Sequence, residues 1–277
     1  MTSLRISTIC GVALCLTFVG SASAQTWSGP YIGGTVGAGL QREDASESVT
    51  FDTNLDGMFG DTVRTAAGAD AFSPGFCAGI AMGAQPSAGC ADDEDGIDVG
   101  VRVGYDRQLG HMVIGALIDL SRVDVTDGVS AFSTTPAFYA FSRELTHVVG
   151  LRGRVGFGSS RVLVYGTAGG AWGGVEHLFT TSNGVNSFVP AKDVAHSEKS
   201  WGYQAGGGVE LMLGSHWSLT GEYLFTSLDD GEEGAVRSQG PAPATNPFIL
   251  VNASGTDLRR TDRFEFQTAR AGLSYRF

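Results

Sequence analysis

The sequence predicts an all-β chain that folds as an eight-stranded antiparallel up-and-down transmembrane β-barrel with long extracellular loops. Three observations support this expectation. Eight segments of about ten residues alternate apolar and polar side chains, as strands do when one face meets lipid and the other a polar interior. The connections between them alternate between long and short. The 41 glycines are dispersed among 42% hydrophobic residues without a collagen-like period, which suits strongly curved strands.

The first four strands are expected at residues 31–41, 98–109, 112–123 and 146–157. In the second, Val101 lies on one face and Arg102 on the other, because side chains alternate along a strand. In the third, Asp119 falls on the inner face, with Leu117 as a less polar exception.

The last four strands are expected at residues 162–175, 201–213, 218–228 and 269–277. Glu210 and Glu222 face inward in the sixth and seventh strands. In the eighth, Tyr275 and Phe277 lie on the apolar face and Arg270 on the polar face. The alternation continues to the final residue, so we expect this strand to be paired to its end.

The connections indicate how the strands are arranged. Long ones are expected at 42–97, 124–145, 176–200 and 229–262, and short turns near 110–111, 158–161 and 214–216. Short turns on one side and long loops on the other are typical of outer-membrane barrels, whose turns lie in the periplasm. Closure pairs the backbone N–H and C=O groups within the protein, as hydrocarbon requires. We therefore expect both termini in the periplasm.

Aromatic residues at the strand ends separate this prediction from its alternative. A soluble exported eight-stranded sandwich or barrel would also alternate, but it would hide its apolar face and would not need aromatic girdles. The periplasmic girdle is expected to contain Tyr31, Tyr105, Phe157, Trp217, Tyr275 and Phe277, and the loop-side girdle Trp172, Trp201 and Tyr203. These girdles favour the membrane barrel.

Residues 1–24 are expected to be a cleaved signal peptide. They combine a positive Arg5, an apolar run at 9–20 and the cleavage motif Ala22-Ser23-Ala24. The run is shorter than the roughly 20 residues that a membrane-spanning helix needs. The mature chain is then residues 25–277, a single barrel domain, and it begins on Gln25 rather than on the cysteine of a lipoprotein.

Two cysteines remain after removal of the signal peptide. Cys77 and Cys90 both lie in the first long loop, 42–97. An even pair in an exported chain predicts a disulfide, with two free thiols as the alternative.

The inward positions of the predicted strands carry both signs of charge. They are Arg102, Asp119, Arg152, Arg154, Glu210, Glu222 and Arg270. An eight-stranded barrel is just wide enough inside for side chains to fill it, so these residues are expected to form a lumen network of ion pairs and hydrogen bonds. An ion-selective conduction path remains the alternative.

The first long loop also contains a weak candidate for a calcium site. Asp52, Asn54 and Asp56 match the start of a calcium-binding loop, but Val63 stands where that loop needs a bidentate glutamate. A solvated acidic loop is the expectation, with no metal and no cofactor. The acidic run 92–95 is likewise expected to be solvated surface.

Catalysis is not expected. An outer-membrane lipid A deacylase, acyltransferase or omptin-like protease would need a histidine with hydroxyl or acidic partners near the loop-side rim. His147, His177 and His196 lie near loops, and His-Ser-Glu at 196–198 is the nearest cluster, but no catalytic motif of these classes is present. The net charge of −11, or −12 without Arg5, also argues against a nucleic-acid partner.

Six stretches together resemble a known family. They are WSGPYIGGTVGAG (27–39), GLRGRVGFG (150–158), LVYGTAGGAWG (163–173), WGYQAGGGVELML (201–213), HWSLTGEYLF (216–225) and ARAGLSYRF (269–277). The chain is similar to the small outer-membrane β-barrel proteins of Gram-negative bacteria, the porin-like surface antigens related to the OmpA-type domain. The resemblance implies that Tyr275 and Phe277 form the signal read by the barrel-assembly machinery. The long first loop and Leu117, where an acidic lumen residue is expected, depart from the family pattern.

These features lead to one expected function. We expect a monomer of the cell outer membrane, in contact with lipid and lipopolysaccharide, that acts as a structural and surface-interaction protein of adhesin or antigen type. Its loops would meet host or other cell-surface ligands. The alternatives are a narrow porin-like channel and, more distantly, a lipid A-modifying enzyme.

Overall fold

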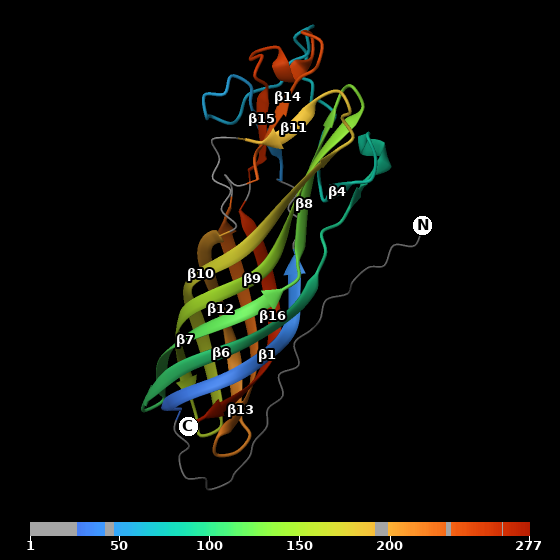
Figure 1. The fold of residues 1–277 in the computed structure, drawn as a ribbon. Helices are drawn as coiled ribbons and strands as arrows, with labels where there is room; N and C mark the ends of the chain where they lie inside the picture. The colour runs from blue at the N-terminus through green and yellow to red at the C-terminus, as the bar shows by residue number, and fades with distance from the viewer. Residues whose placement is uncertain (1–26, 42–46, 192–198, 231–233, 262) are drawn as a thin grey trace.

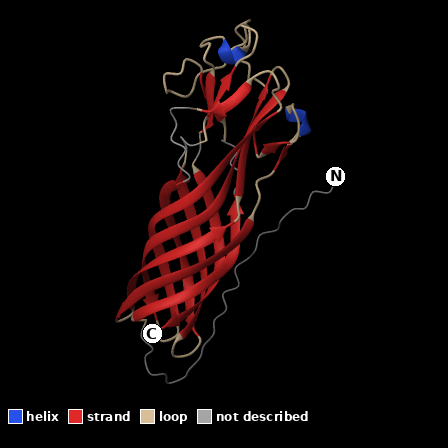
Figure 2. Ribbon diagram, in the orientation of Figure 1, coloured by secondary structure: helices blue, strands red, loops and turns tan. Residues whose placement is uncertain are grey.

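The structure is a computed structural model, and it describes residues 27–41, 47–191, 199–230, 234–261 and 263–277. The predicted signal peptide, residues 1–24, and His196 lie outside these ranges. In the part of the chain that is described, no helix is long and apolar enough to cross a membrane. Strands and turns dominate, with two short 3-10 helices, η1 (Pro86–Ala88) and η2 (Pro247–Ile249) (Figure 2).

Eight long strands form a closed antiparallel barrel (Figure 1). They are β1 (Gly29–Gln41), β6 (Gly96–Leu109), β7 (Met112–Val123), β9 (Ala137–Gly158), β10 (Val162–Thr181), β12 (Lys199–Met212), β13 (Trp217–Asp229) and β16 (Phe264–Arg276). Each pairs with the next, and β16 closes the barrel on β1. The predicted fold class is confirmed, and the closed ladder leaves no unpaired edge within the barrel wall.

The two faces of the wall differ as the alternation predicts. In β6, Val101 is 59% exposed on the outside, whereas the adjacent Arg102 is 1% exposed on the inside. Leu117 is buried on the inner face as well, opposite Arg152 in the β7–β9 ladder. Rows of exposed Val, Ile and Leu side chains suit lipid and not water, because a soluble monomer rarely exposes a large continuous apolar surface.

Two barrel strands extend much farther than the sequence predicts. β9 begins at Ala137 and β10 ends at Thr181, and their pairing continues to Tyr139 and Thr181 after a register shift between Gly174 and Val175. β8 (Thr126–Ser133) pairs with the outer half of β9, and β3 (Gly75–Ala78) with β8. The predicted limits of the loops at 124–145 and 176–200 are therefore wrong. β8 is buried on both faces, so it shows no period of two.

A second, four-stranded sheet stands above the barrel (Figure 2). Its order is β11 (Ser187–Pro190), β14 (Val236–Gln239), β15 (Thr256–Arg260) and β2 (Val49–Asp52). A further pair, β4 (Ile80–Ala81) and β5 (Cys90–Ala91), lies in the first long loop. Buried aromatic rings, including Phe51, Phe72, Tyr139 and Phe248, form a core between these segments and the outer ends of β9 and β10. We refer to these parts together as the extracellular region.

One predicted girdle residue is misplaced. Tyr105, Phe157, Trp217 and Phe277 are exposed on the outer surface, but Tyr31 is 1% exposed inside the barrel. The reason is the alternation itself, because the next residue in β1, Ile32, faces outward.

Candidate functional site

The lumen holds a closed ring of four alternating charges near its periplasmic end. Asp106, Arg154, Glu210 and Arg276 project inward from β6, β9, β12 and β16, and we call them the periplasmic quartet. Arg154 Nε donates to Asp106 Oδ1 at 2.7 Å, and Arg154 Nη1 donates to Glu210 Oε2 at 3.0 Å. Arg276 Nη2 completes the ring at 2.8 Å from Asp106 and 2.9 Å from Glu210. Each charge thus has two partners of opposite sign.

Aromatic rings surround the two arginines of this quartet. The Tyr31 ring lies 4.8 Å from the guanidinium carbons of both Arg154 and Arg276. Trp27 lies 4.9 Å from Arg276, and its backbone carbonyl accepts a hydrogen bond from Arg276 Nη1 at 3.1 Å. The inward position of Tyr31 therefore has a clear role, which is to hold both cations by cation–π contact.

A second ring of charges lies deeper in the lumen. Asp119, Arg152, Glu222 and Arg270 come from β7, β9, β13 and β16, and we call them the central quartet. Arg152 Nη2 lies 3.1 Å from Asp119 and 3.4 Å from Glu222. Arg270 Nη2 lies 3.0 Å from Asp119 and 2.7 Å from Glu222. All four side chains are buried, so the pairing offsets the large cost of removing these charges from water.

Tyr165 and Arg102 connect the quartets to their surroundings. The Tyr165 ring lies 5.0 Å from Arg154, and its hydroxyl donates to Glu222 Oε2 at 2.7 Å. Arg102 donates instead to two hydroxyls, Thr220 Oγ1 at 2.5 Å and Ser274 Oγ at 3.1 Å.

The structure therefore brings six of the seven predicted lumen residues into the two quartets and places Arg102 beside hydroxyl groups. Asp106 and Arg276 were not among the predicted lumen residues, although both lie on the polar faces of predicted strands. The period of two alone would have found them. Asp98, which lies 3.9 Å from Arg270, was also not among the predicted lumen residues. In the charged section of the lumen, the described residues include five buried arginines and five buried carboxylates, so the charges balance. The arginines are Arg102, Arg152, Arg154, Arg270 and Arg276, and the carboxylates are Asp98, Asp106, Asp119, Glu210 and Glu222.

Apolar clusters lie beyond both ends of this charged section. Toward the extracellular side, nine fully buried residues form one cluster: Val123, Val125, Leu145, Val148, Ala171, Val175, Leu228, Phe264 and Phe266. At the periplasmic end, Trp27, Val113, Leu163 and Met212 pack together with Tyr165. A hydrated ion crossing the lumen would have to pass both clusters and part the quartets.

A third ionic group sits above the extracellular cluster. Arg143 Nη1 donates to Asp230 Oδ1 at 2.6 Å, and Arg260 Nη2 lies 3.2 Å from Asp127 and 3.3 Å from Glu47. This group was not predicted, because its members lie in predicted loops, where the sequence does not distinguish buried charges from solvated ones.

Carboxylate oxygens of Glu47, Asp93 and Asp127 approach within 4.8 Å of one another, which is close enough for a metal site. The Arg260 guanidinium already contacts two of them, and so it supplies the positive charge that a cation would bring.

The weak calcium candidate forms a turn. Asp52 Oδ1 accepts the backbone N–H of Leu55 at 2.6 Å, and its Oδ2 accepts that of Gly57 at 2.8 Å. The Asn54 and Asp56 side chains accept further backbone N–H groups of the same turn. These oxygens face backbone donors and shape the loop.

The remaining predicted residues are placed as follows. Cys77 and Cys90 form a disulfide, with 6.6 Å between their Cα atoms, that ties β3 to β5. Phe277 is 71% exposed, its ring lies 5.1 Å from Tyr275, and its N–H donates to Pro30 O at 3.1 Å.

Two of the three candidate histidines are described, and they lie in separate settings. His147 is exposed and shares a 3.0 Å hydrogen bond with Thr146 Oγ1. His177 Nε2 lies 3.9 Å from Asp230 Oδ2.

Comparison with known proteins agrees with this architecture. The family model described as "Outer membrane protein beta-barrel domain" matches residues 10–277. The 31 kDa outer-membrane immunogenic proteins of Brucella melitensis and Brucella suis are each 28% identical over 180 residues, which is 64% of this chain and 65% of theirs. The match therefore spans slightly less than two thirds of the length of these relatives.

Two solved structures are similar at low sequence identity. The outer membrane protein OprG of Pseudomonas aeruginosa is 14% identical with a TM-score of 0.48, covering 92% of this chain and 99% of OprG. The attachment invasion locus protein Ail of Yersinia pestis is 11% identical with a TM-score of 0.31, covering 90% of this chain and 99% of Ail. On the family match over nearly its whole length, the chain belongs to the outer membrane protein β-barrel family.

Proposed function

We propose that this outer-membrane barrel is a structural and surface-interaction protein, of adhesin or antigen type, that holds a folded extracellular region on a closed, non-conducting support. The observation that carries the proposal is the filled lumen, in which two charge quartets lie between two apolar clusters. Separating the quartets would leave buried charges unpaired, at a cost of several kcal/mol each. A permanent water path is not compatible with that arrangement.

The extracellular region supports the surface role. It has its own sheet, its own aromatic core and a disulfide, so it presents a defined surface in place of solvated loops. Binding residues are common on segments that a rigid scaffold positions. The name of the Brucella relatives, immunogenic protein, is in keeping with such exposure.

The proposal includes the route to the membrane. Residues 1–24 would direct export and be removed, and Tyr275 and Phe277 would be read by the barrel-assembly machinery. The mature chain, 25–277, would then act as a monomer surrounded by lipid and lipopolysaccharide. No catalytic step is proposed, and a His147→Ala variant should leave the lipid A profile of the cells unchanged.

Planar-bilayer conductance of the refolded mature chain tests the closed lumen. Wild type, Glu210→Gln and Arg152→Gln would be compared at equal protein insertion. Silence, or rare events that neither substitution changes, supports the scaffold. Steady channels whose ion selectivity shifts with the substitutions would overturn it and make the chain a narrow porin-like channel.

Surface interaction is tested separately. Cells that display the protein should adhere to host cells more strongly than cells that lack it, and the refolded protein should compete. Equal adhesion, together with no antibody binding to intact cells, would contradict the proposed role.

A further inference from the structure

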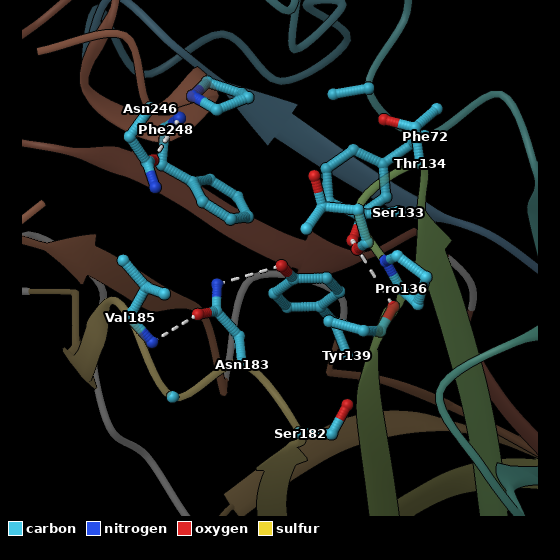
Figure 3. A pocket seen from close by; sticks show the side chains of 15 residues that line it. Phe72, Ser133, Thr134, Pro136, Tyr139, Ser182, Asn183, Val185, Asn246 and Phe248 are labelled. Carbon is cyan, nitrogen blue, oxygen red and sulfur yellow. Dashed lines mark hydrogen bonds between the residues drawn. The ribbon is translucent and has the colours of Figure 1, made fainter. Parts of the chain in front are cut away.

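The extracellular region contains a pocket of about 240 Å³ that the proposed function leaves unexplained (Figure 3). Its base is formed by three aromatic rings that contact one another. The centroid of Phe72 lies 5.2 Å from that of Tyr139 and 5.9 Å from that of Phe248, and Tyr139 and Phe248 are 5.4 Å apart. These rings come from the first long loop, the outer part of β9 and the connection between β13 and β16, so the pocket exists only in the folded extracellular region.

The walls of the pocket are uncharged. Its fifteen lining residues include no Asp, Glu, Lys, Arg or His, although the chain as a whole carries a net charge of −11. Burial raises the pKa of Tyr139 above its usual value, so its hydroxyl stays neutral. A pocket without a charged lining residue favours a neutral ligand, because neither a cation nor an anion would find a partner of opposite charge there.

The rim offers hydrogen-bonding groups. In the described chain, the hydroxyls of Thr134 and Thr135 make no hydrogen bond to protein, and both residues are exposed at the mouth. Asn183 on the opposite side is already fixed, because its Nδ2 donates to the Tyr139 hydroxyl at 3.0 Å and its Oδ1 accepts from the Val185 N–H at 2.8 Å. Figure 3 shows the Asn183 and Thr134 sides facing each other across the aromatic base.

We infer that this pocket binds a single neutral sugar ring at the end of, or within, a surface glycan. The inference deepens the proposed function, on which it rests, by giving the chemistry of the ligand. A pyranose has C–H groups that can contact the apolar base, where Phe72, Tyr139 and Phe248 are only 2–5% exposed, and hydroxyls that can bond to the threonine hydroxyls and amide groups at the rim. The volume falls just below the roughly 300 Å³ at which pockets for drug-sized ligands begin, which matches one ring.

An apolar side chain of a partner protein is the competing occupant. It would fill the aromatic base equally well, but it would cover the rim hydroxyls without bonding to them. Covering polar groups in this way costs free energy unless they are paired. The sugar is therefore the better fit, and the experiment includes the competitor.

Saturation-transfer NMR on the refolded mature chain tests the inference. The probes are the methyl glycosides of glucose, galactose, mannose and N-acetylglucosamine, with N-acetylphenylalaninamide as the apolar side-chain probe. We expect transfer to at least one neutral glycoside. No transfer to any glycoside, or transfer to the phenylalanine probe alone, would overturn the inference.

Two variants should fill the pocket, and a third variant, outside the pocket, serves as the control. Val185, which is 55% exposed, lines the pocket, and Val185→Trp should abolish transfer. Gly184 also lines the pocket, and a Cβ there meets no atom within 4 Å, so a larger side chain can be accommodated. Gly184→Trp should therefore also abolish transfer. Leu178→Trp, at a position of β10 that is 61% exposed and lies outside the pocket, should keep the signal. Transfer that survives in both pocket variants would place the sugar elsewhere and overturn the inference.

The outcome is separable from that of the proposed function. If the lumen conducts, the proposed non-conducting scaffold is overturned, whether or not the pocket binds sugar. If the pocket variants bind no sugar but adhere to host cells like wild type, the surface role stands and the pocket is not its binding site, which overturns the link between the two.

Discussion

The Tyr165 hydroxyl donates a 2.7 Å hydrogen bond to Glu222, while the ring of the same tyrosine lies 5.0 Å from Arg154. One side chain thereby joins the central quartet to the periplasmic quartet. Because β10 contributes no charge to either quartet, Tyr165 is also how this strand takes part in the lumen network.

Tyr165→Phe isolates this connection. The substitution keeps the ring and removes one hydrogen bond to a buried carboxylate, so we expect a loss of about 2 kcal/mol in the free energy of unfolding. Urea unfolding in lipid vesicles measures it. Tyr105→Phe, on the exposed outer face, is the matched control and should change little. Equal effects of the two substitutions would contradict the connecting role.

Glu210→Gln should be much more damaging than the loss of an exposed ion pair. Glu210 holds both Arg154 and Arg276, and its loss leaves them undercompensated in a buried site, for which roughly 3–5 kcal/mol is expected. The control is Asp229→Asn, which removes an exposed partner of Arg263 and should cost at most about 1 kcal/mol. The same unfolding assay compares them, and similar losses would show that the quartet is not the stabilising unit.

The Cys77–Cys90 disulfide should stabilise the extracellular region and leave the barrel unaffected. It closes a short loop, 13 residues in sequence separation, for which the chain-entropy argument gives about 3 kcal/mol. Reduction, or the double change Cys77→Ser and Cys90→Ser, should open residues 79–91 to limited proteolysis while the unfolding of the barrel is unchanged. Adding reductant to the double variant should have no further effect. Unfolding of the barrel together with the extracellular region, after reduction or in the double variant, would contradict the separate stability of the two parts.

The turn at residues 52–61 should be sensitive to acid. The Thr53 hydroxyl and N–H donate to Asp61 Oδ2 at 2.7 and 2.9 Å, and they hold the pKa of Asp61 below its usual value of 3.8. The stabilisation is therefore complete above that value and is lost as the pH falls through the lower, folded-state pKa. Hydrogen exchange at the Thr53 amide should accelerate there, relative to the amides of the barrel. Thr53→Val should weaken this pH dependence, and an unchanged profile would contradict it.

Phe277→Ala should impair assembly without impairing the folded barrel. The side chain is exposed beyond the ladder and contacts Tyr275, so its removal creates no cavity in the core. We expect less protein in the outer membrane of cells, measured by heat-modifiable mobility, but normal refolding in detergent. Leu213→Ala, with a side chain 61% exposed at the same end of the barrel, is the control. Equal yields for wild type and Phe277→Ala in cells would contradict the assembly signal.

Sequence reasoning predicts the barrel wall well because lipid and lumen impose opposite chemistry on adjacent residues. Val101 and Arg102 could not exchange faces without placing a charge in hydrocarbon. The same logic identifies the inward arginines and carboxylates. It does not give their grouping, because the partners of Arg270, for example, come from β6, β7 and β13, whose spatial relationship depends on the tilt and stagger of the closed barrel.

The extracellular region could not be predicted in the same way. In β8, consecutive residues are buried on both faces, and β2, β11 and β14 have only four residues each. Segments this short carry too few residues for a period to be distinguished from chance. The pocket lined by Phe72, Tyr139 and Phe248 depends on the meeting of two of the long connections with the outer part of β9.

The long β9–β10 hairpin sets the reach of the protein. Its strands form part of the barrel wall and continue outward as one paired ladder, which runs from Gly158 and Leu163 to Tyr139 and Thr181 with one register shift between Gly174 and Val175. At roughly 3.3 Å per residue, the outer part of β9, from Ala137 to Leu145, adds about 30 Å of strand length. The pocket lined by Phe72, Tyr139 and Phe248 therefore lies at the outer end of a ladder that begins inside the barrel wall, and a ligand on another cell would reach it before reaching the barrel itself.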